Sequence, residues 1–150
     1  MRRTFYIPGK TISVNSTYYG DKRHGMNTAS RDWQHQAFHA LSSASHQKSF
    51  TELRALFDEK IHGLKIGITM MVPASELYTK DGKLSSRVHD LSNIEKSLVD
   101  VMLLKKYSAQ ESPYGVQNML TDDRYLKQLQ SRKQVAETWG IRISITICPK

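Results

Sequence analysis

The stretch Leu64–Val72, which reads LKIGITMMV, decides the fold because its apolar residues alternate along the chain. Ile141–Ile147 repeats this pattern, with isoleucine at every second position and polar side chains between them. A period of two sends alternate side chains to opposite faces of a strand. The two stretches therefore predict strands of a sheet that buries one face.

Two weaker extended patterns accompany these strands. Thr4–Ile7 predicts a short strand that Pro8 and Gly9 terminate. Tyr125–Val135 predicts a polar, basic strand, and residues 137–140 predict a turn that pairs it with the last strand as a hairpin. Asp81 and Gly82 provide a separate turn signal.

Helical patterns occupy much of the remaining chain. One helix is expected from about Ser30 to Ala44, with Trp33 in its apolar face, and residues 42–45 read as a loop. A second is expected from Ser49, which forms a capping-box pattern with Glu52. A third is expected over about 92–105, and residues 106–121 read as a loop. This irregular mixture predicts one α+β domain over residues 1–150, with a small mixed β-sheet packed against helices.

Charge restricts the partners of this domain. The chain has 150 residues, 22 Lys and Arg against 14 Asp and Glu, and a net charge of +8, which favours a polyanionic partner. Its one cysteine, Cys148, excludes an intrachain disulfide and a cysteine-ligated metal centre. No apolar run reaches the about 18 residues that indicate a membrane span, so no membrane partner is expected.

The most informative stretch for chemistry is His89–Asp100, which reads HDLSNIEKSLVD. At about 100° per residue, a helix places Asn93, Lys96 and Asp100 on one side and its apolar residues on another. Asp90 precedes the helix, where the macrodipole favours a carboxylate. The alternative interpretation is structural: Ser92 and Glu95 form a capping box, and the polar side is only solvated.

A second acidic pair, Asp122 and Asp123, opens the basic strand. Carboxylate oxygens suit Mg²⁺, and also Mn²⁺. In a cationic protein, basic side chains would hold phosphates while carboxylates bring a metal to the scissile one. Taken alone, such a pair equally fits a loop or a strand cap.

Taken together, these motifs resemble the RusA family of Holliday-junction resolvases. The family pattern is Asp-x-Asp-Asn, a lysine three residues later, an aspartate four beyond that, and an Asp-Asp pair after a loop. The matching residues here are Asp90, Ser92, Asn93, Lys96 and Asp100, followed by Leu120-Thr121-Asp122-Asp123. Ser13, Asn15 and Tyr18 are similar to the family's early Ser/Asn/Tyr segment. The resemblance covers nearly the whole chain, with extra length around 42–60 and 106–119.

The resemblance implies a homodimeric Mg²⁺-dependent endonuclease that cuts branched DNA, specifically four-way junctions, in recombination and repair. It implies a RusA-like fold and a location in the cytoplasm of a bacterial or phage-infected cell. The metal would be held by Asp90 and Asp123 with Asp122, and Lys96 would be catalytic. Asn93 and Asp100 would support the site.

Ser92 departs from the family pattern, which has aspartate at this position. A hydroxyl is a weaker metal ligand than a carboxylate, so three outcomes are open. Asp122 or Asp100 compensates, metal binding is weakened, or the protein binds branched DNA without cutting it. A further alternative is that Ser92 is simply the helix N-cap.

Other residues are candidates for contacts with nucleic acid. Asn15 and Tyr18 would line a DNA groove, and the basic residues of the polar strand would hold the backbone; these are Arg124, Lys127, Arg132 and Lys133. The alternatives are ordinary packing for the tyrosine and a solvated face for the basic residues. His35 and His39 have the helical spacing of zinc ligands but favour a solvated helix surface. A third functional hypothesis is a basic subunit that docks on RNA or protein.

Overall fold

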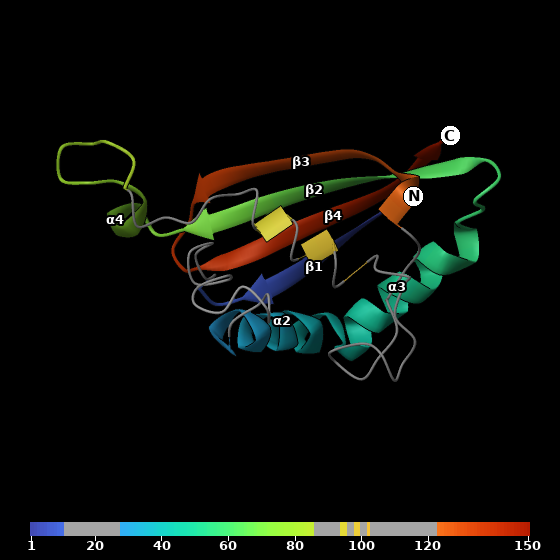
Figure 1. Ribbon diagram of the computed structural model, residues 1–150, viewed down its shortest axis with the longest axis horizontal. Coiled ribbons are helices and arrows are strands. Elements are labelled where there is room, and N and C mark those ends of the chain that lie inside the picture. The colour runs from blue at the N-terminus through green and yellow to red at the C-terminus, as the bar shows by residue number, and fades with distance from the viewer. Residues whose placement is uncertain (11–27, 86–93, 96–97, 100–101, 103–122) are drawn as a thin grey trace.

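The computed structural model describes residues 1–10, 28–85, 94–95, 98–99, 102 and 123–150, and gives the backbone alone for 28–32, 34 and 123. Its elements follow the order strand, two helices, strand, short helix, 3-10 turn and two strands (Figure 1). Their bounds are β1 Arg2–Pro8, α2 Thr28–Leu41, α3 Ala44–Leu56, β2 His62–Val72, α4 Ala74–Leu77, η1 Asp123–Tyr125, β3 Leu126–Val135 and β4 Gly140–Pro149.

The strands form one mixed sheet in the order β1-β4-β2-β3. β4 pairs antiparallel with both β1 and β2, whereas β3 runs parallel to β2. The predicted α+β class with a small mixed sheet is therefore confirmed. The alternating stretches 64–72 and 141–147 lie in the two central strands, β2 and β4, as their buried apolar faces require.

The predicted hairpin between the last two strands is wrong, because β2 lies between β3 and β4. Residues 136–139 connect strands that are two sheet positions apart. Two positions span about 9.6 Å, which a connection of this length covers when extended. β3 is the most polar strand, and at the edge its charged side chains remain in water. The apolar β2 thus takes the central place beside β4.

The helices differ from the prediction mainly at their ends. α2 ends at Leu41, and α3 already begins at Ala44, so Ser49 and Glu52 lie inside a helix and do not cap it. Ser43 is the N-cap instead and accepts a hydrogen bond from the His46 amide at 3.4 Å. The expected serine loop therefore reduces to residues 42–43. The short helix α4 was not predicted.

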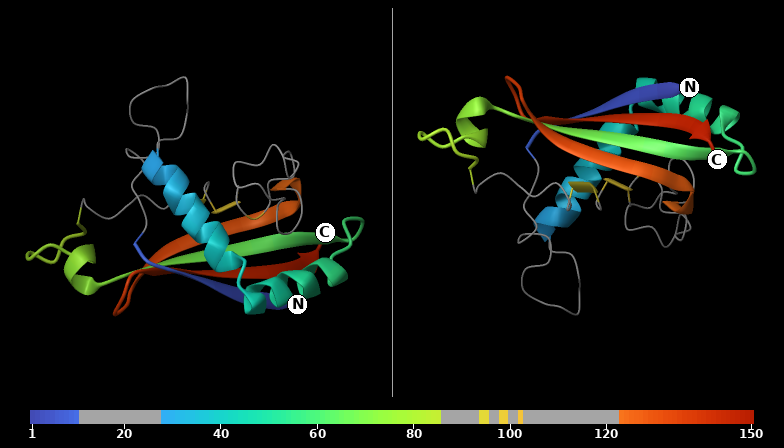
Figure 2. Two further views of the ribbon diagram at one scale, coloured as in Figure 1. Left: turned by 90° about the horizontal axis from the view of Figure 1, so that it is seen from below. Right: turned by 90° about the horizontal axis from the view of Figure 1, so that it is seen from above.

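The core lies between one face of the sheet and the helices (Figure 2). Residues 94–95, 98–99 and 102 are helical, and Ile94, Leu98 and Met102 are buried in this core, as the spacing predicts. Trp33 of α2 is also buried there, which confirms its predicted packing role. In Figure 2, α2 and the helical residues after 94 lie on the same side of the sheet, and no described helix covers the other side.

The predicted turn at Asp81-Gly82 is confirmed. The Thr79 amide donates to the Lys83 carbonyl oxygen at 2.7 Å, and Gly82 has a φ of +77°, which favours glycine. Within the described part of the chain, no helix is both long and apolar enough to cross a membrane.

Candidate functional site

Most of the acidic motif predicted from the sequence lies outside the described residues. This applies to eight candidates: Asn15, Tyr18, Asp90, Ser92, Asn93, Lys96, Asp100 and Asp122. Asp123 is described by its backbone alone and opens the 3-10 turn η1, immediately before β3. The assigned metal ligands and Lys96 therefore remain predictions.

Glu95 is the described residue nearest to the centre of the motif, and it contacts β3. Ser131 Oγ donates a hydrogen bond to Glu95 Oε1. Ser131 lies five residues beyond the start of β3, or roughly 16 Å along the strand. Glu95 thus contacts the middle of β3, whereas Asp123 precedes the first residue of this strand.

The basic residues predicted to hold DNA do not form one cluster. Arg132 pairs with Thr69 and projects from the sheet face opposite the core, whereas Lys133 pairs with Met70 on the core side. Lys127 lies over Gly63 and donates to the Pro149 carbonyl oxygen at 3.1 Å. Arg124 lies in η1 with its guanidinium 5.1 Å from the centre of the Tyr125 ring. Only part of the predicted basic strand therefore shares a surface.

A different basic surface emerges on the side of the sheet that no described helix covers, which we term the open face. The strand register arranges its side chains in rows. The first row is Arg2, Thr146, Lys65 and Gln128; the second is Thr4, Ser144, Gly67 and Gln130; the third is Tyr6, Arg142, Thr69 and Arg132. Cationic side chains thus occur in the first and third rows, and small or uncharged ones in the second.

The small second row makes a hollow of about 570 Å³ between the cationic rows. Gly67 and Ser144 form its floor, and Arg2, Arg132 and Arg142 line it. A Cβ atom at Gly67 would lie 2.8 Å from Ser144 Oγ, so glycine is what keeps the two strands' side chains clear of each other here. The floor therefore presents hydroxyl groups and backbone.

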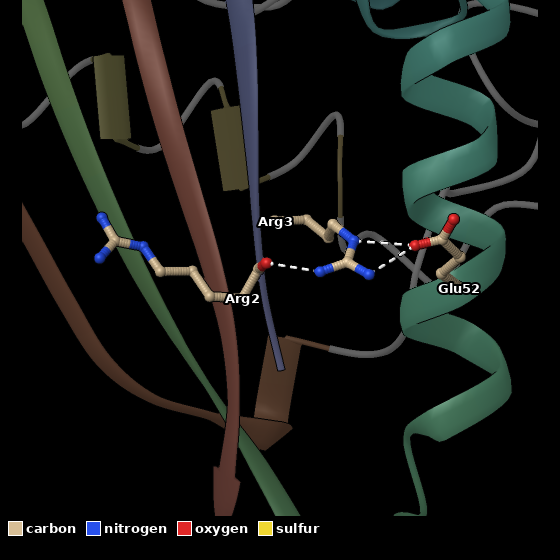
Figure 3. A network of polar contacts seen from close by, with 3 residues as sticks. All are labelled: Arg2, Arg3 and Glu52. Atoms are coloured by element: carbon tan, nitrogen blue, oxygen red, sulfur yellow. Dashed lines mark hydrogen bonds and ion pairs between the residues drawn. The ribbon is translucent and has the colours of Figure 1, made fainter.

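The arginines around the hollow are held differently. Arg132 Nε donates to Thr69 Oγ1 at 3.3 Å, and Arg142 Nη2 donates to Gln134 Oε1 at 3.3 Å. Figure 3 shows Arg2 extending across β4 and β2, while its neighbour Arg3 points away to α3. Hydroxyl and amide partners orient the guanidinium groups without neutralising them.

The electrostatics of the open face are set by the composition of the strands. None of the four strands contains an aspartate or a glutamate. The ion pairs seen among the described residues lie elsewhere: Arg3 with Glu52 of α3 at 2.6 Å (Figure 3), and Lys10 with Glu76 of α4 at 3.8 Å. Among the described residues, no carboxylate pairs with the cationic side chains of the open face, and positive charge of this kind attracts anions.

Comparison with known proteins finds no relative of this chain. No protein-family model matches this chain, and no curated protein matches it. The resemblance to RusA resolvases therefore rests on the residues quoted above.

Among the side chains that the structure describes, no three or more His, Cys, Asp and Glu residues cluster in a way that would hold a metal ion. His35 and His39 are exposed on α2, as the solvated interpretation predicts. Asp90 and Asp122 lie outside the described residues, so their proposed Mg²⁺ or Mn²⁺ site stays a prediction from the donor chemistry alone.

The sequence analysis missed Arg2, Lys65 and Arg142 as partners in one surface. The alternation in the two central strands was a usable signal, because it already turns Lys65 and Arg142 away from the core. Their grouping with Arg2 and Arg132 depends on the strand order. That order is a tertiary property, which the local pattern does not carry.

Proposed function

We propose that this chain is a metal-dependent, structure-selective DNA endonuclease that resolves four-way junctions in recombination and repair. The observation that carries the proposal is the ordered motif from Asp90 to Asp100 followed by Asp122 and Asp123. An α+β domain with a mixed sheet and the cationic open face support it. We further propose a RusA-like fold and a homodimer, since two symmetric cuts in a symmetric junction suit a two-fold assembly.

The proposed chemistry divides the charges between two tasks. Asp90 and Asp123, with Asp122, would hold Mg²⁺, which activates water and polarises a phosphodiester when bound. Lys96 would stabilise negative charge that develops on the phosphate. Asn93 and Asp100, which the sequence spacing predicts on the same helical side as Lys96, would hold these groups in position.

Cleavage of a synthetic four-way junction in the presence of Mg²⁺ or Mn²⁺ tests this proposal. Asp90→Asn and Asp123→Asn should each abolish cleavage while junction binding stays intact or tightens, because each removes a negative charge near DNA phosphates. Asp81→Asn, in the exposed turn, is the matched control and should cut normally. Near wild-type cleavage by either site variant would show that the assigned site is wrong.

Lys96→Ala separates a catalytic lysine from a simple phosphate contact. Cleavage should fall much more than binding if the ammonium acts on the developing charge, an effect worth several kcal/mol in a preorganised site. Equal losses of binding and rate would assign Lys96 to ordinary phosphate binding.

Ser92 favours a second candidate function, a RusA-like protein that binds branched DNA without cutting it. The absence of a carboxylate at this position removes one negative charge from the proposed metal site. Junction binding without cleavage in either metal would support this second function. Binding that does not respond to salt would instead support the hypothesis of a basic subunit that docks on RNA or protein.

A further inference from the structure

We infer that the open face binds the sugar-phosphate backbone of a nucleic-acid duplex, on the side of the sheet opposite Glu95. Its first and third rows carry Arg2, Lys65, Arg132 and Arg142, and no strand supplies a carboxylate to neutralise them. Uncompensated cations in a row are the electrostatic footprint of a polyanion partner.

The spacing of the rows fits a run of phosphates. The first and third rows lie four residues apart along each strand, which is roughly 13 Å at about 3.3 Å per residue. One strand of a duplex advances about 3.4 Å per phosphate along its axis and also winds around that axis, so neighbouring phosphates lie further apart than this rise and the distance between the rows spans fewer than about four of them. The two rows can therefore contact both ends of one short backbone segment.

The second row supplies uncharged hydrogen-bonding groups. Thr4 and Ser144 offer hydroxyl donors, Gln130 offers an amide, and Gly67 leaves room for the backbone to approach. Hydroxyl and amide side chains commonly contact phosphate oxygens and sugars without reading sequence. The hollow is consequently suited to a phosphate group between the flanking arginines.

The face lacks the features of a surface that reads unpaired bases. Single-strand binders stack bases on several aromatic side chains. Tyr6 is the one aromatic side chain in the three rows, and its hydroxyl lies close to Gly140. Backbone contact with a duplex therefore fits better than base stacking.

A second copy of this chain fits the open face poorly. An isologous dimer through this face would set the same cationic rows against each other. Without carboxylates in the strands, such an interface would bring like charges together with no compensation. Charge complementarity therefore favours a polyanion over self-association.

The open face and Glu95 lie on opposite sides of the sheet. Glu95 contacts Ser131, whose row on the core side includes Phe5, Ile143 and Ile68. A duplex on the open face would thus lie across the sheet from any nucleic acid near Glu95. A four-way junction offers arms for both sides. The inference goes beyond cleavage, and binding in a metal chelator tests it independently.

Two double variants make a matched comparison. Lys65→Gln/Arg142→Gln removes a lysine and an arginine from the open face. Lys48→Gln/Arg54→Gln removes the same two residue types from the exposed surface of α3, so both variants lose the same net charge. Binding of a labelled DNA duplex is measured with a chelator present over a range of salt concentrations, and thermal unfolding verifies that each variant folds.

Each phosphate contact contributes about 0.9 to the slope of log K against log salt. The open-face variant should therefore lose about 2 from the magnitude of this slope and bind roughly 50-fold more weakly at about 0.1 M salt. The α3 variant should keep the wild-type slope. Equal slopes for the two variants, or equal weakening, would overturn the inference, because charge alone would then explain binding.

Thr4→Glu provides a second variant in case the first fails to fold. It adds a carboxylate at an exposed position in the second row and removes no contact that holds the sheet. It should weaken duplex binding strongly, by the same amount for two unrelated DNA sequences. Unchanged binding would exclude the open face. A change of oligomeric state in the open-face variant, with duplex binding intact, would show instead that a second copy occupies this surface.

Discussion

Ser131 of β3 donates a hydrogen bond to the carboxylate of Glu95, the residue that immediately precedes Lys96. Ser131 projects from the core side of the edge strand, and Glu95 belongs to the helical segment whose Ile94, Leu98 and Met102 fill the core. The apolar residues fix how deeply this segment packs. The hydrogen bond fixes its position along β3.

Ser131→Ala should loosen this attachment. A hydrogen bond to a charged group contributes roughly 1.5–3 kcal/mol, and water can replace part of it at the half-buried Glu95, so we expect a loss of about 1 kcal/mol in unfolding free energy. Junction cleavage should fall because the contact positions the segment that carries Lys96, while duplex binding in chelator should not change. Ser45→Ala, at an exposed position of α3 away from the sheet, is the control for the same change. Cleavage and stability equal to wild type would show that the contact positions nothing.

Gly67 and Ser144 should be energetically coupled across the floor of the hollow. Alanine in a strand interior is favoured over glycine by roughly 0.5–1 kcal/mol, so Gly67→Ala should stabilise the protein in a Ser144→Ala background. In the wild-type background, the new Cβ meets Ser144 Oγ at 2.8 Å, and this gain should be reduced or lost. Urea denaturation of the two single variants and the double variant measures the coupling. Strictly additive effects would show that the serine hydroxyl moves aside at no cost.

The environment of Tyr125 predicts that the free energy of unfolding falls at alkaline pH. Its hydroxyl donates to Glu59 Oε2 at 2.8 Å, and this hydrogen bond, with partial burial, raises its pKa above the ordinary value of 10.0. A raised pKa favours the protonated tyrosine in the folded state. The stabilisation is therefore fully present below pH 10.0 and is lost as the pH rises through the folded pKa. Wild type and Tyr125→Phe should differ in unfolding free energy at neutral pH and converge at high pH; a constant difference would exclude this link.

The parts of the fold that the sequence predicts are those fixed by burial of one face. The alternation at 64–72 and 141–147 and the spacing of Ile94, Leu98 and Met102 each follow from a single element against the core. The strand order does not, because it depends on which strands compete for the central positions. The polar β3 pairs with β2 at the edge, and no pattern within β3 or β4 alone excludes the simpler hairpin.

The two candidate sites differ in the same way: a local sequence pattern predicts one, and the strand order determines the other. The acidic motif is short enough in sequence for its spacing to indicate a chemistry. The positions of its side chains remain a prediction. The open face joins Arg2, Lys65, Arg132 and Arg142 from four strands across the whole chain, and only their pairing reveals one surface. Likewise, Ser49 and Glu52 satisfy a capping pattern, but Ser43 lies earlier and starts the helix, so Glu52 becomes available to Arg3.

Ser92 offers the sharpest distinction between an enzyme and a binder. Ser92→Asp should lower the metal concentration needed for junction cleavage if the position is a weakened ligand, because it restores a carboxylate. Helix stability should hardly change, since aspartate and serine are similar N-caps.

Ser92→Ala should lower the free energy of unfolding by about 1 kcal/mol if the hydroxyl caps the helix, and this loss should be visible as a modest fall in melting temperature. Normal cleavage by that variant would assign Ser92 to capping alone and leave metal binding to the other carboxylates. Loss of cleavage in Ser92→Asp would mean that Asp122 or Asp100 already fills the ligand position. Cleavage gained only in Ser92→Asp, with none in the natural protein, would establish a junction binder that lacks one carboxylate of an active nuclease.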